Sequence, residues 1–306
     1  METSLRAVHT LLECQSGNAT VLTDKAPVLA QQIGSLASIE AYPSHIRQAL
    51  TTLSLTLHNI HPLGSPPTPA QMAILLNAIG DEYEKVIFLL RSHASFSSVG
   101  YALPTLRPVN YHRNVFHVLN ALLAVLFYEF ILTYTQAVII VFLFLAWYAA
   151  MDFIRRLFPN VQAALFDRLF SRITRPRERF TVPAATWYCV GMLLVLLFAE
   201  KTVAQVSVLV LGVGDPAATL IGRSVRSPKI YGQKSVAGFI GFASVSFSTV
   251  LLFLAALRPQ FSLPYSMAMA WVAGAVGAVA ELFSNDRVDD NISVPVTVAL
   301  ALSLLF

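Results

Sequence analysis

Charged residues are scarce in this chain. Only 12% of the 306 residues are Asp, Glu, Lys or Arg, whereas 56% are apolar, and soluble domains carry about 25% charged residues. A soluble fold could not bury that much apolar surface, so the composition excludes an ordinary soluble enzyme. The scarcity is also uneven, because residues 1–110 have the composition of a soluble domain and the remainder alternates long apolar runs with short charged loops. Two parts are expected.

Cysteine is almost absent as well. Cys14 lies in the polar part and Cys189 inside an apolar run, so the two define neither a disulfide framework nor a metal site. A net charge of +4 could attract nucleic acid, but no basic patch with interleaved aromatic residues occurs. The arginines flank apolar runs, where anionic lipid headgroups are the nearer partner. We therefore expect a membrane partner and no nucleic-acid partner.

The N-terminus lacks the parts of a secretory signal peptide. METSLRAVHTLLECQSG has no basic start, no continuous apolar core and no small-residue cleavage site. Later apolar segments are therefore expected to direct membrane insertion.

Residues 1–95 carry apolar residues at helical spacing, for example Ile46, Leu50 and Leu53. We expect three or four short amphipathic helices, the last of them ended after Ser92 by the turn-rich run SHASFSSVG. No catalytic motif is visible in this part. A small cap or docking domain over residues 1–110 is the expected interpretation, and its role stays open.

Beyond Tyr111 the apolar runs are long enough to cross a membrane, which takes about 20 helical residues. The expected spans are residues 115–133, 134–151, 181–200, 203–222, 235–257, 266–283 and 291–306. The last of these is short for a span. The predicted fold class is all-α, a polytopic membrane helix bundle of about seven spans over residues 111–306 with a small N-terminal helical soluble domain.

Loop charge predicts the orientation, because Lys and Arg are retained on the cytoplasmic side. The basic loops at 107–113, 155–179 and 223–234 all fall on one side of this alternating topology. The N-terminal domain and the site described below are therefore expected to face the cytoplasm, whereas the endoplasmic reticulum, plastid and plasma membrane stay equally open. Within the long loop, residues 161–173 fit either a helix in the headgroup plane or a packed hairpin.

The fourth span contains a polar interruption. In VAQVSVLVLGVGDPAATLIGR, Gly212, Gly214 and Pro216 weaken the helix, and Asp215 places a carboxylate near the membrane. Intramembrane carboxylates usually face a cavity, a partner or an ion. A broken helix with free N–H groups that bind phosphate is expected here, and the alternative is a proline kink with Asp215 paired to an arginine.

A basic loop follows this span. RSVRSPKIYGQKSVAGFIG holds Lys234 and leads into span five, so it supplies the cations, flexible backbone and helix N-terminus that a triphosphate needs. The spacing of a P-loop is absent, so we reject that interpretation. Alone, the loop would fit lipid anchoring better.

Acidic residues gather at the end of span six, in AELFSNDRVDDNISVP. Glu281 and Asp290 lie nearest the membrane, and carboxylates opposite a phosphate-binding loop are what Mg²⁺ requires.

At the start of span one, HRNVFHVLN places Arg113, His117 and Asn120 on one helical face. These three could hold a phosphate or orient an alcohol, although Arg113 could equally snorkel to the interface.

These stretches resemble the CTP-dependent lipid-alcohol kinases, which include dolichol, phytol, farnesol and fungal-type diacylglycerol kinases. GDPAATLIGR at 214–223 and YGQKSVAGFIG at 231–241 look like the central motif of the family, HRNVFHVLN like its opening element and DDNISVP like its closing element. The resemblance covers about residues 110–306. Residues 1–110 have no counterpart, Asn114 stands where a lysine is common, and Phe239 stands where a small hydroxyl residue is common.

The resemblance implies transfer of the γ-phosphoryl group of CTP to the hydroxyl of a polyprenol or dolichol, a phytol-like prenol or diacylglycerol. Asp215 and Lys234 would be catalytic, and Asp215, Glu281 and Asp290 would hold Mg²⁺. The expected nucleotide-binding residues are Gly214, Gly222, Arg223, Gly232, Ser235 and Gly238, and the expected entrance residues are Arg113, His117 and Asn120. Two alternatives stay open: a cytidylyltransferase that forms a CDP-lipid, and a non-catalytic transporter or scaffold. The lipid and the oligomeric state also stay open.

Overall fold

The computed structural model describes residues 1–13, 19–60, 69–104, 106, 111–158, 178, 181–232, 234–285 and 288–305. Helices dominate these residues, and the sheet among them has two strands. Contacts divide the chain into two compact units, residues 1–108 with 175–181 and residues 109–174 with 182–306. Residues 161–173, for which a headgroup-plane helix or a packed hairpin is expected, lie outside the described residues.

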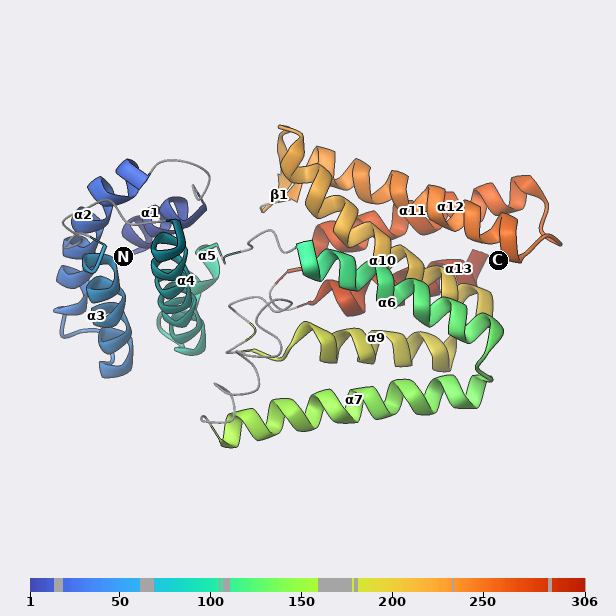
Figure 1. Ribbon diagram of the computed structural model, residues 1–306, viewed down its shortest axis with the longest axis horizontal. Coiled ribbons are helices and arrows are strands. Elements are labelled where there is room, and N and C mark those ends of the chain that lie inside the picture. The colour runs from blue at the N-terminus through green and yellow to red at the C-terminus, as the bar shows by residue number, and fades with distance from the viewer. Residues whose placement is uncertain are drawn as a thin grey trace. The chain divides into compact units, whose positions relative to one another are not determined.

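The first unit is a cluster of amphipathic helices (Figure 1). Its helices are α1 (Glu2–Glu13), α2 (Ala19–Ala37), α3 (Ser44–His58), α4 (Pro69–Ser92) and α5 (Ser97–Ala102). The residues expected from helical spacing form its core, since Ile46, Leu50 and Leu53 are fully buried. Among the described residues of 1–95 there are four helices, α1 to α4, within the expected three or four, and α4 ends at Ser92 as expected; α5 follows as an extra short helix. The run after Ser92 forms the extra short helix because Gly100 packs against the backbone of α4, where the Arg91 Nε donates to its carbonyl oxygen at 2.8 Å.

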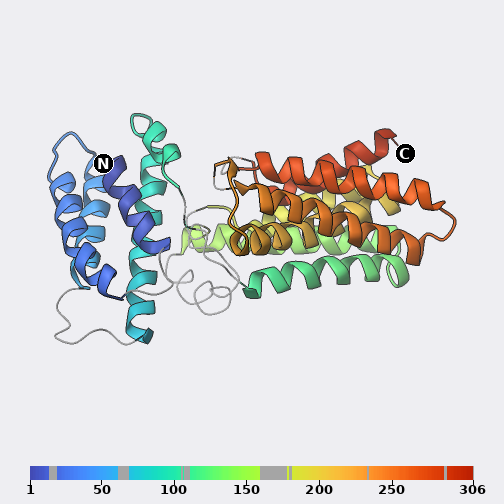
Figure 2. The same ribbon diagram turned by 90° about the horizontal axis from the view of Figure 1, so that it is seen from above.

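The second unit is a helical bundle with a small hairpin at one end (Figures 1 and 2). Its elements are α6 (Tyr111–Phe130), α7 (Tyr134–Leu157), α9 (Ala184–Phe198), α10 (Lys201–Ser224), β1 (Lys229–Tyr231), β2 (Lys234–Ser235), α11 (Val236–Leu257), α12 (Leu263–Phe283) and α13 (Asp290–Leu305). Consecutive helices run up and down the bundle. The end where α10 finishes and α11 starts is called the site end below, and the opposite end the far end.

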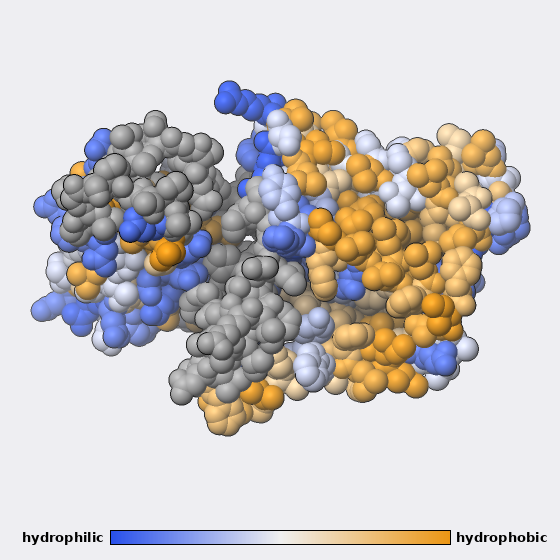
Figure 3. Space-filling view, in the orientation of Figure 1, coloured by the Kyte–Doolittle hydropathy of each residue, from blue (hydrophilic) through white to orange (hydrophobic). Residues whose placement is uncertain are grey.

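In the described part of the second unit, four helices are long and apolar enough to cross a membrane: α7, α10, α11 and α12. The helices α9 and α13 are apolar but shorter, with 15 and 16 residues. Figure 3 shows apolar side chains over most of the visible flank of the bundle and polar ones toward its two ends. The chain is therefore an all-α membrane protein.

The centre of the bundle is α10. In its most apolar stretch 78% of the residues are buried, against 6% in α7, which lies at the edge of the bundle in Figure 1. Small residues let the neighbours of α10 approach closely, as is common in membrane helices. A Cβ atom added to Gly212 would lie 2.1 Å from the Cβ of Ala121 on α6, and one added to Gly214 would lie 2.5 Å from the ring of Phe242 on α11.

The expected break in α10 is wrong, because the helix is continuous from Lys201 to Ser224 and includes Pro216. Membrane helices tolerate proline where neighbouring helices support the backbone, and Gly212 and Gly214 are held by Ala121 and Phe242. The glycines therefore serve helix packing. The free N–H groups expected at a break do not exist in this helix.

Candidate active site

Three buried carboxylates meet at the site end of the bundle. Asp215 on α10 is 7% exposed, Glu281 on α12 is 8% exposed and Asp290 at the start of α13 is 9% exposed. The charges of Asp215 and Asp290 both act on Glu281. The structure thus brings together acidic residues from three helices that are far apart in the sequence.

Lys234 on β2 reaches into this acidic group. Its Nζ lies 2.7 Å from the Glu281 Oε1 and 2.7 Å from the Ser284 Oγ, and it also donates to the carbonyl oxygen of Glu281. Both side chains of the ion pair are nearly buried. By contrast, no Lys or Arg among the described residues forms an ion pair with Asp215. The lysine expected to bind phosphates therefore already neutralises one expected metal ligand.

Ser284 is a site residue that the sequence analysis missed. It caps the C-terminus of α12, its hydroxyl donates to the carbonyl oxygen of Glu281 at 2.9 Å, and it accepts from Lys234. Only its position directly after a span, three residues beyond Glu281, could have indicated it. The C-terminal end of a helix also attracts a cation, so this end of α12 forms a binding place for the ammonium group.

A β-hairpin, and not the expected flexible loop, holds Lys234 in place. Lys229 and Tyr231 pair with Ser235 and Lys234 in antiparallel register, and the connection contains Gly232 at φ 56°. That left-handed conformation favours glycine, which has no Cβ atom to clash. Tyr231 also contacts Phe283 with ring centroids 5.8 Å apart, which fixes the hairpin against the end of α12.

Three expected nucleotide-binding residues join α10 to α11. The Ser235 hydroxyl caps α11 by accepting from the Gly238 N–H at 3.2 Å, and it donates to the Gly222 carbonyl at 3.4 Å. A Cβ atom added to Gly222 would lie 3.2 Å from the Cα of Gly238. These contacts are structural, and contacts of the same residues with a nucleotide stay a prediction. Arg223 lies in the exposed last turn of α10.

The expected entrance residues of α6 divide between two faces. Arg113 is 5% exposed, and the His117 ring lies edge-on to Tyr188 of α9 with centroids 5.8 Å apart. Asn120, however, is exposed, whereas Asn114 is 8% exposed. The inward face follows four-residue steps from His117 through Ala121 to Val125, which turns Asn120 outward. Asn120 is therefore exposed where Arg113 is buried, and the roles of Arg113, His117 and Asn120 at an entrance stay a prediction.

Two fungal proteins are similar to this chain in sequence. The CTP-dependent diacylglycerol kinase 1 of Saccharomyces cerevisiae is 28% identical over 168 residues, which are 49% of this chain and 57% of that protein. The CTP-dependent diacylglycerol kinase 1 of Schizosaccharomyces pombe is 30% identical over 150 residues, 46% of this chain and 68% of that protein. The chain belongs to the CTP-dependent lipid-alcohol kinase family.

A plant relative extends the comparison within the family. "Probable phytol kinase 1, chloroplastic" of Oryza sativa subsp. japonica is 29% identical over 207 residues, which are 64% of this chain and 65% of that protein. The chain thus spans only about two thirds or less of the length of these named relatives. No protein-family profile matches the chain. No solved structure matches it either.

The donor set of the site fits the metal chemistry that the family implies. Asp215, Glu281 and Asp290 offer carboxylate oxygens, which Mg²⁺ prefers together with phosphate oxygens and water. Lys234 pairs with Glu281 of this set. Within the described residues, however, no three His, Cys, Asp or Glu side chains already form a metal-binding group. A Mg²⁺ ion held by these carboxylates would take further ligands from phosphate oxygens and water.

Proposed function

We propose that the chain is an integral membrane kinase that transfers the γ-phosphoryl group of CTP to the hydroxyl of a long-chain lipid alcohol. The acceptor is a diacylglycerol or a prenol such as phytol or a polyprenol. The observation that carries the proposal is the meeting of Asp215, Glu281 and Asp290 with Lys234 at one end of the bundle. The relatives support it, because two are named CTP-dependent diacylglycerol kinases and one a phytol kinase.

Phosphoryl transfer demands positioning and charge neutralisation more than covalent work by the protein. When bound, Mg²⁺ supplies positive charge that offsets the charge of the phosphates, and Asp215, Glu281 and Asp290 would hold it. Asp215 also accepts or orients the proton of the lipid hydroxyl. Lys234 and Arg223 neutralise the triphosphate, and the hairpin fixes the approach of Lys234.

The ammonium group of Lys234 is already bound within the protein, so a triphosphate must compete for it or share it. Its ammonium group contacts Glu281 and Ser284 in the described state. We propose that phosphate oxygens draw Lys234 away from the Glu281 carboxylate, which frees that carboxylate for Mg²⁺. The Ser284 hydroxyl keeps the ammonium near the site during this exchange.

The same proposal includes the membrane arrangement. In this proposal α6 and the six apolar helices of the second unit all cross the bilayer, and the site end and the helical domain of residues 1–110 both face the cytoplasm. The basic residues support this orientation, because Arg113, Arg155 and Arg223 all lie toward the site ends of their helices. The lipid tail stays in the bilayer, and only its hydroxyl reaches the site.

A substrate panel tests the proposed activity. Purified full-length protein in nanodiscs receives CTP, ATP, GTP or UTP with diacylglycerol, phytol, farnesol or dolichol, and lipid phosphate and CDP are measured. Stoichiometric formation of CDP and lipid phosphate from CTP and one of the alcohols supports the kinase. A CDP-lipid with pyrophosphate would instead show the cytidylyltransferase, and no turnover with any pair would favour a transporter or scaffold.

A further inference from the structure

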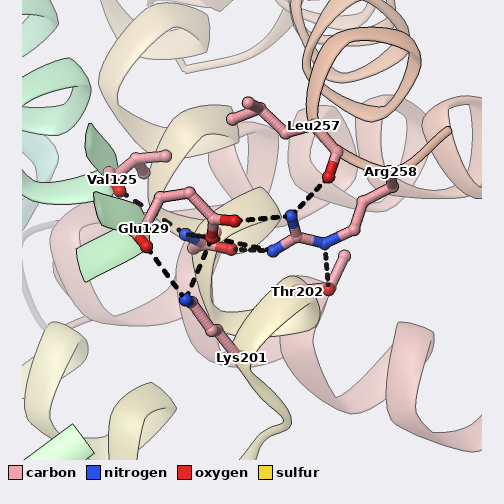
Figure 4. A network of polar contacts seen from close by, with 7 residues as sticks. Val125, Glu129, Lys201, Thr202, Leu257 and Arg258 are labelled. Atoms are coloured by element: carbon pink, nitrogen blue, oxygen red, sulfur yellow. Dashed lines mark hydrogen bonds and ion pairs between the residues drawn. The ribbon is translucent and has the colours of Figure 1, made fainter. Parts of the chain in front are cut away.

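A second polar group lies at the far end of the bundle, away from the site. Arg258, which ends α11, forms a two-pronged ion pair with Glu129 near the end of α6: Nη1 to Oε1 and Nη2 to Oε2 are both 2.9 Å (Figure 4). Two-pronged pairs of this kind are strong and geometrically specific. The two residues are 129 positions apart in the sequence, so this contact connects distant elements.

The beginning of α10 completes this group. The Arg258 Nε donates to the Thr202 Oγ1 at 2.8 Å, and its Nη2 donates to the Gln205 Oε1 at 2.9 Å. The Gln205 Nε2 donates back to the Glu129 Oε2 at 2.9 Å, and the Lys201 Nζ lies 3.1 Å from the same oxygen. We call Glu129, Thr202, Gln205 and Arg258 the far-end clamp.

The far-end clamp has little capacity for another ligand. The Arg258 Nη1 also donates to the Leu257 carbonyl at 2.6 Å, so all five guanidinium N–H groups have acceptors. Its side chain is 9% exposed, and that of Glu129 is 16% exposed. A buried group whose hydrogen-bond donors all have acceptors within the protein is better suited to holding helices together than to binding a ligand.

The clamp matters because α6 has few other constraints. This helix packs chiefly against α10, and much of its surface is exposed and apolar, including Val115, Leu119 and Phe127. Its close contact with α10 is between Ala121 and Gly212. Contacts between small residues let two membrane helices approach closely, but they do little to stop one helix from shifting along the other. The hydrophobic effect does not hold the two helices together either, because lipid tails are as apolar as the side chains.

The best-documented role of buried polar groups between helices is to fix the register of one helix relative to another. We infer that the far-end clamp fixes the register of α6 on α10 and α11, and thereby sets where Arg113 and His117 stand at the site end. Glu129 and Arg258 are positioning residues in this account. Helical rise places Arg113 about 24 Å from Glu129 along α6, so a shift at one end moves the other. The register claim stands alone, whereas its effect on turnover rests on the proposed function.

Spin-label distances test the register without any reference to activity. Labels at Val115 on α6 and Ile240 on α11, both exposed, are introduced into full-length protein that lacks the native cysteines. The account predicts one narrow distance distribution in the parent and, in E129A and R258A, a displacement or broadening of about 3 Å or more, the rise of two helical residues. A control pair at Ile240 and Val279, which does not include α6, stays unchanged.

Milder and matched variants keep the test decisive if the alanine variants fold poorly. R258K keeps the positive charge but loses the guanidinium group that bonds both carboxylate oxygens of Glu129, so it should broaden the distribution of distances between labels at positions 115 and 240. A distribution identical to that of the parent would overturn the inference. K201A removes a partner that is 43% exposed and should change little. D152N removes a polar pair within α7, in which the Arg155 Nε donates to Asp152 at 2.7 Å, and should leave α6 in place.

Kinetics then separate the clamp from the proposed function. E129Q and R258K should lower kcat about 10- to 100-fold, the scale of a misplacement of about 1 Å, with the KM for CTP changed less than about threefold. A changed register with normal kcat would remove the effect on the site end and leave the clamp standing. A parent protein without turnover would reject the proposed function, and the distances would still decide the register.

Discussion

At the scale of single residues, four side chains from four elements form the centre of the account. Asp215, Lys234, Glu281 and Asp290 were selected from the sequence because charge within or beside an apolar run is rare and costly. The structure adds Ser284, which carries no such signal because a serine after a helix is common. It also leaves Asn120 exposed, because the packed face of α6 advances in four-residue steps from His117 to Ala121 and Val125.

Replacement of Asp215 by Asn should abolish turnover. The change keeps the shape of the side chain but removes the charge, and loss of a proton acceptor costs about 10²- to 10⁴-fold in rate. Stability should change little, because no described cation pairs with Asp215. CDP release and thermal unfolding measure the two effects. E200Q, an exposed acid at the far end, serves as the control, and full turnover by D215N would refute the assignment.

Replacement of Ser284 by Ala should weaken the binding of CTP and raise its KM. Lys234 loses a hydrogen-bond acceptor at 2.7 Å, and one such bond contributes about 1 kcal/mol. A rise of about fivefold in the KM for CTP is expected, measured by initial rates over a CTP series. S248A is the matched control, because the Ser248 hydroxyl bonds only within its own helix at 2.9 Å. An unchanged KM would show that Ser284 does not position Lys234.

At the scale of elements, the sequence predicts helices well and connections poorly. Each apolar run produced a helix within a few residues of its expected bounds, because hydrophobic length and helical hydrogen bonding dominate in a membrane. The continuous α10 and the hairpin were missed, since both depend on tertiary support: Gly214 rests on Phe242 and Tyr231 rests on Phe283. The far-end clamp could not be predicted for the same reason, because the pairing of Glu129 with Arg258 depends on how α6, α10 and α11 pack.

A Cβ atom at Gly212 should disturb the contact between α6 and α10. In G212A the new methyl group would meet the Ala121 Cβ, which lies 2.1 Å away from the ideal position, and overpacking costs about 1–3 kcal/mol. A lower temperature of thermal unfolding in detergent is expected. The double variant A121G/G212A restores the space and should recover most of the loss. Failure of this rescue would mean that the two helices do not touch there.

At the scale of the whole molecule, the up-and-down bundle has two polar ends with different chemistry. The site end has acidic residues, one engaged lysine and a helix terminus, whereas the far end has a closed arginine–glutamate group. Sequence composition predicts that the polar residues lie at the ends of apolar helices. It could not predict which charges pair, because pairing depends on helix rotation and packing.

Orientation can be measured by cysteine accessibility. In full-length protein without the native cysteines, single cysteines replace Val288 at the site end and Gln260 at the far end, both exposed. The account predicts that a membrane-impermeant maleimide labels position 288 from the cytoplasmic side only, and position 260 from the opposite side only. Labelling of both positions from one side would contradict the proposed topology.

Doubly labelled CTP tests the central claim most directly. Full-length protein in nanodiscs with diacylglycerol or phytol receives CTP that carries different isotopes at the α- and γ-phosphorus atoms. The account predicts γ-label in the lipid, α-label in released CDP, and neither transfer in D215N. Appearance of α-label in the lipid, or equal transfer by D215N, would contradict it.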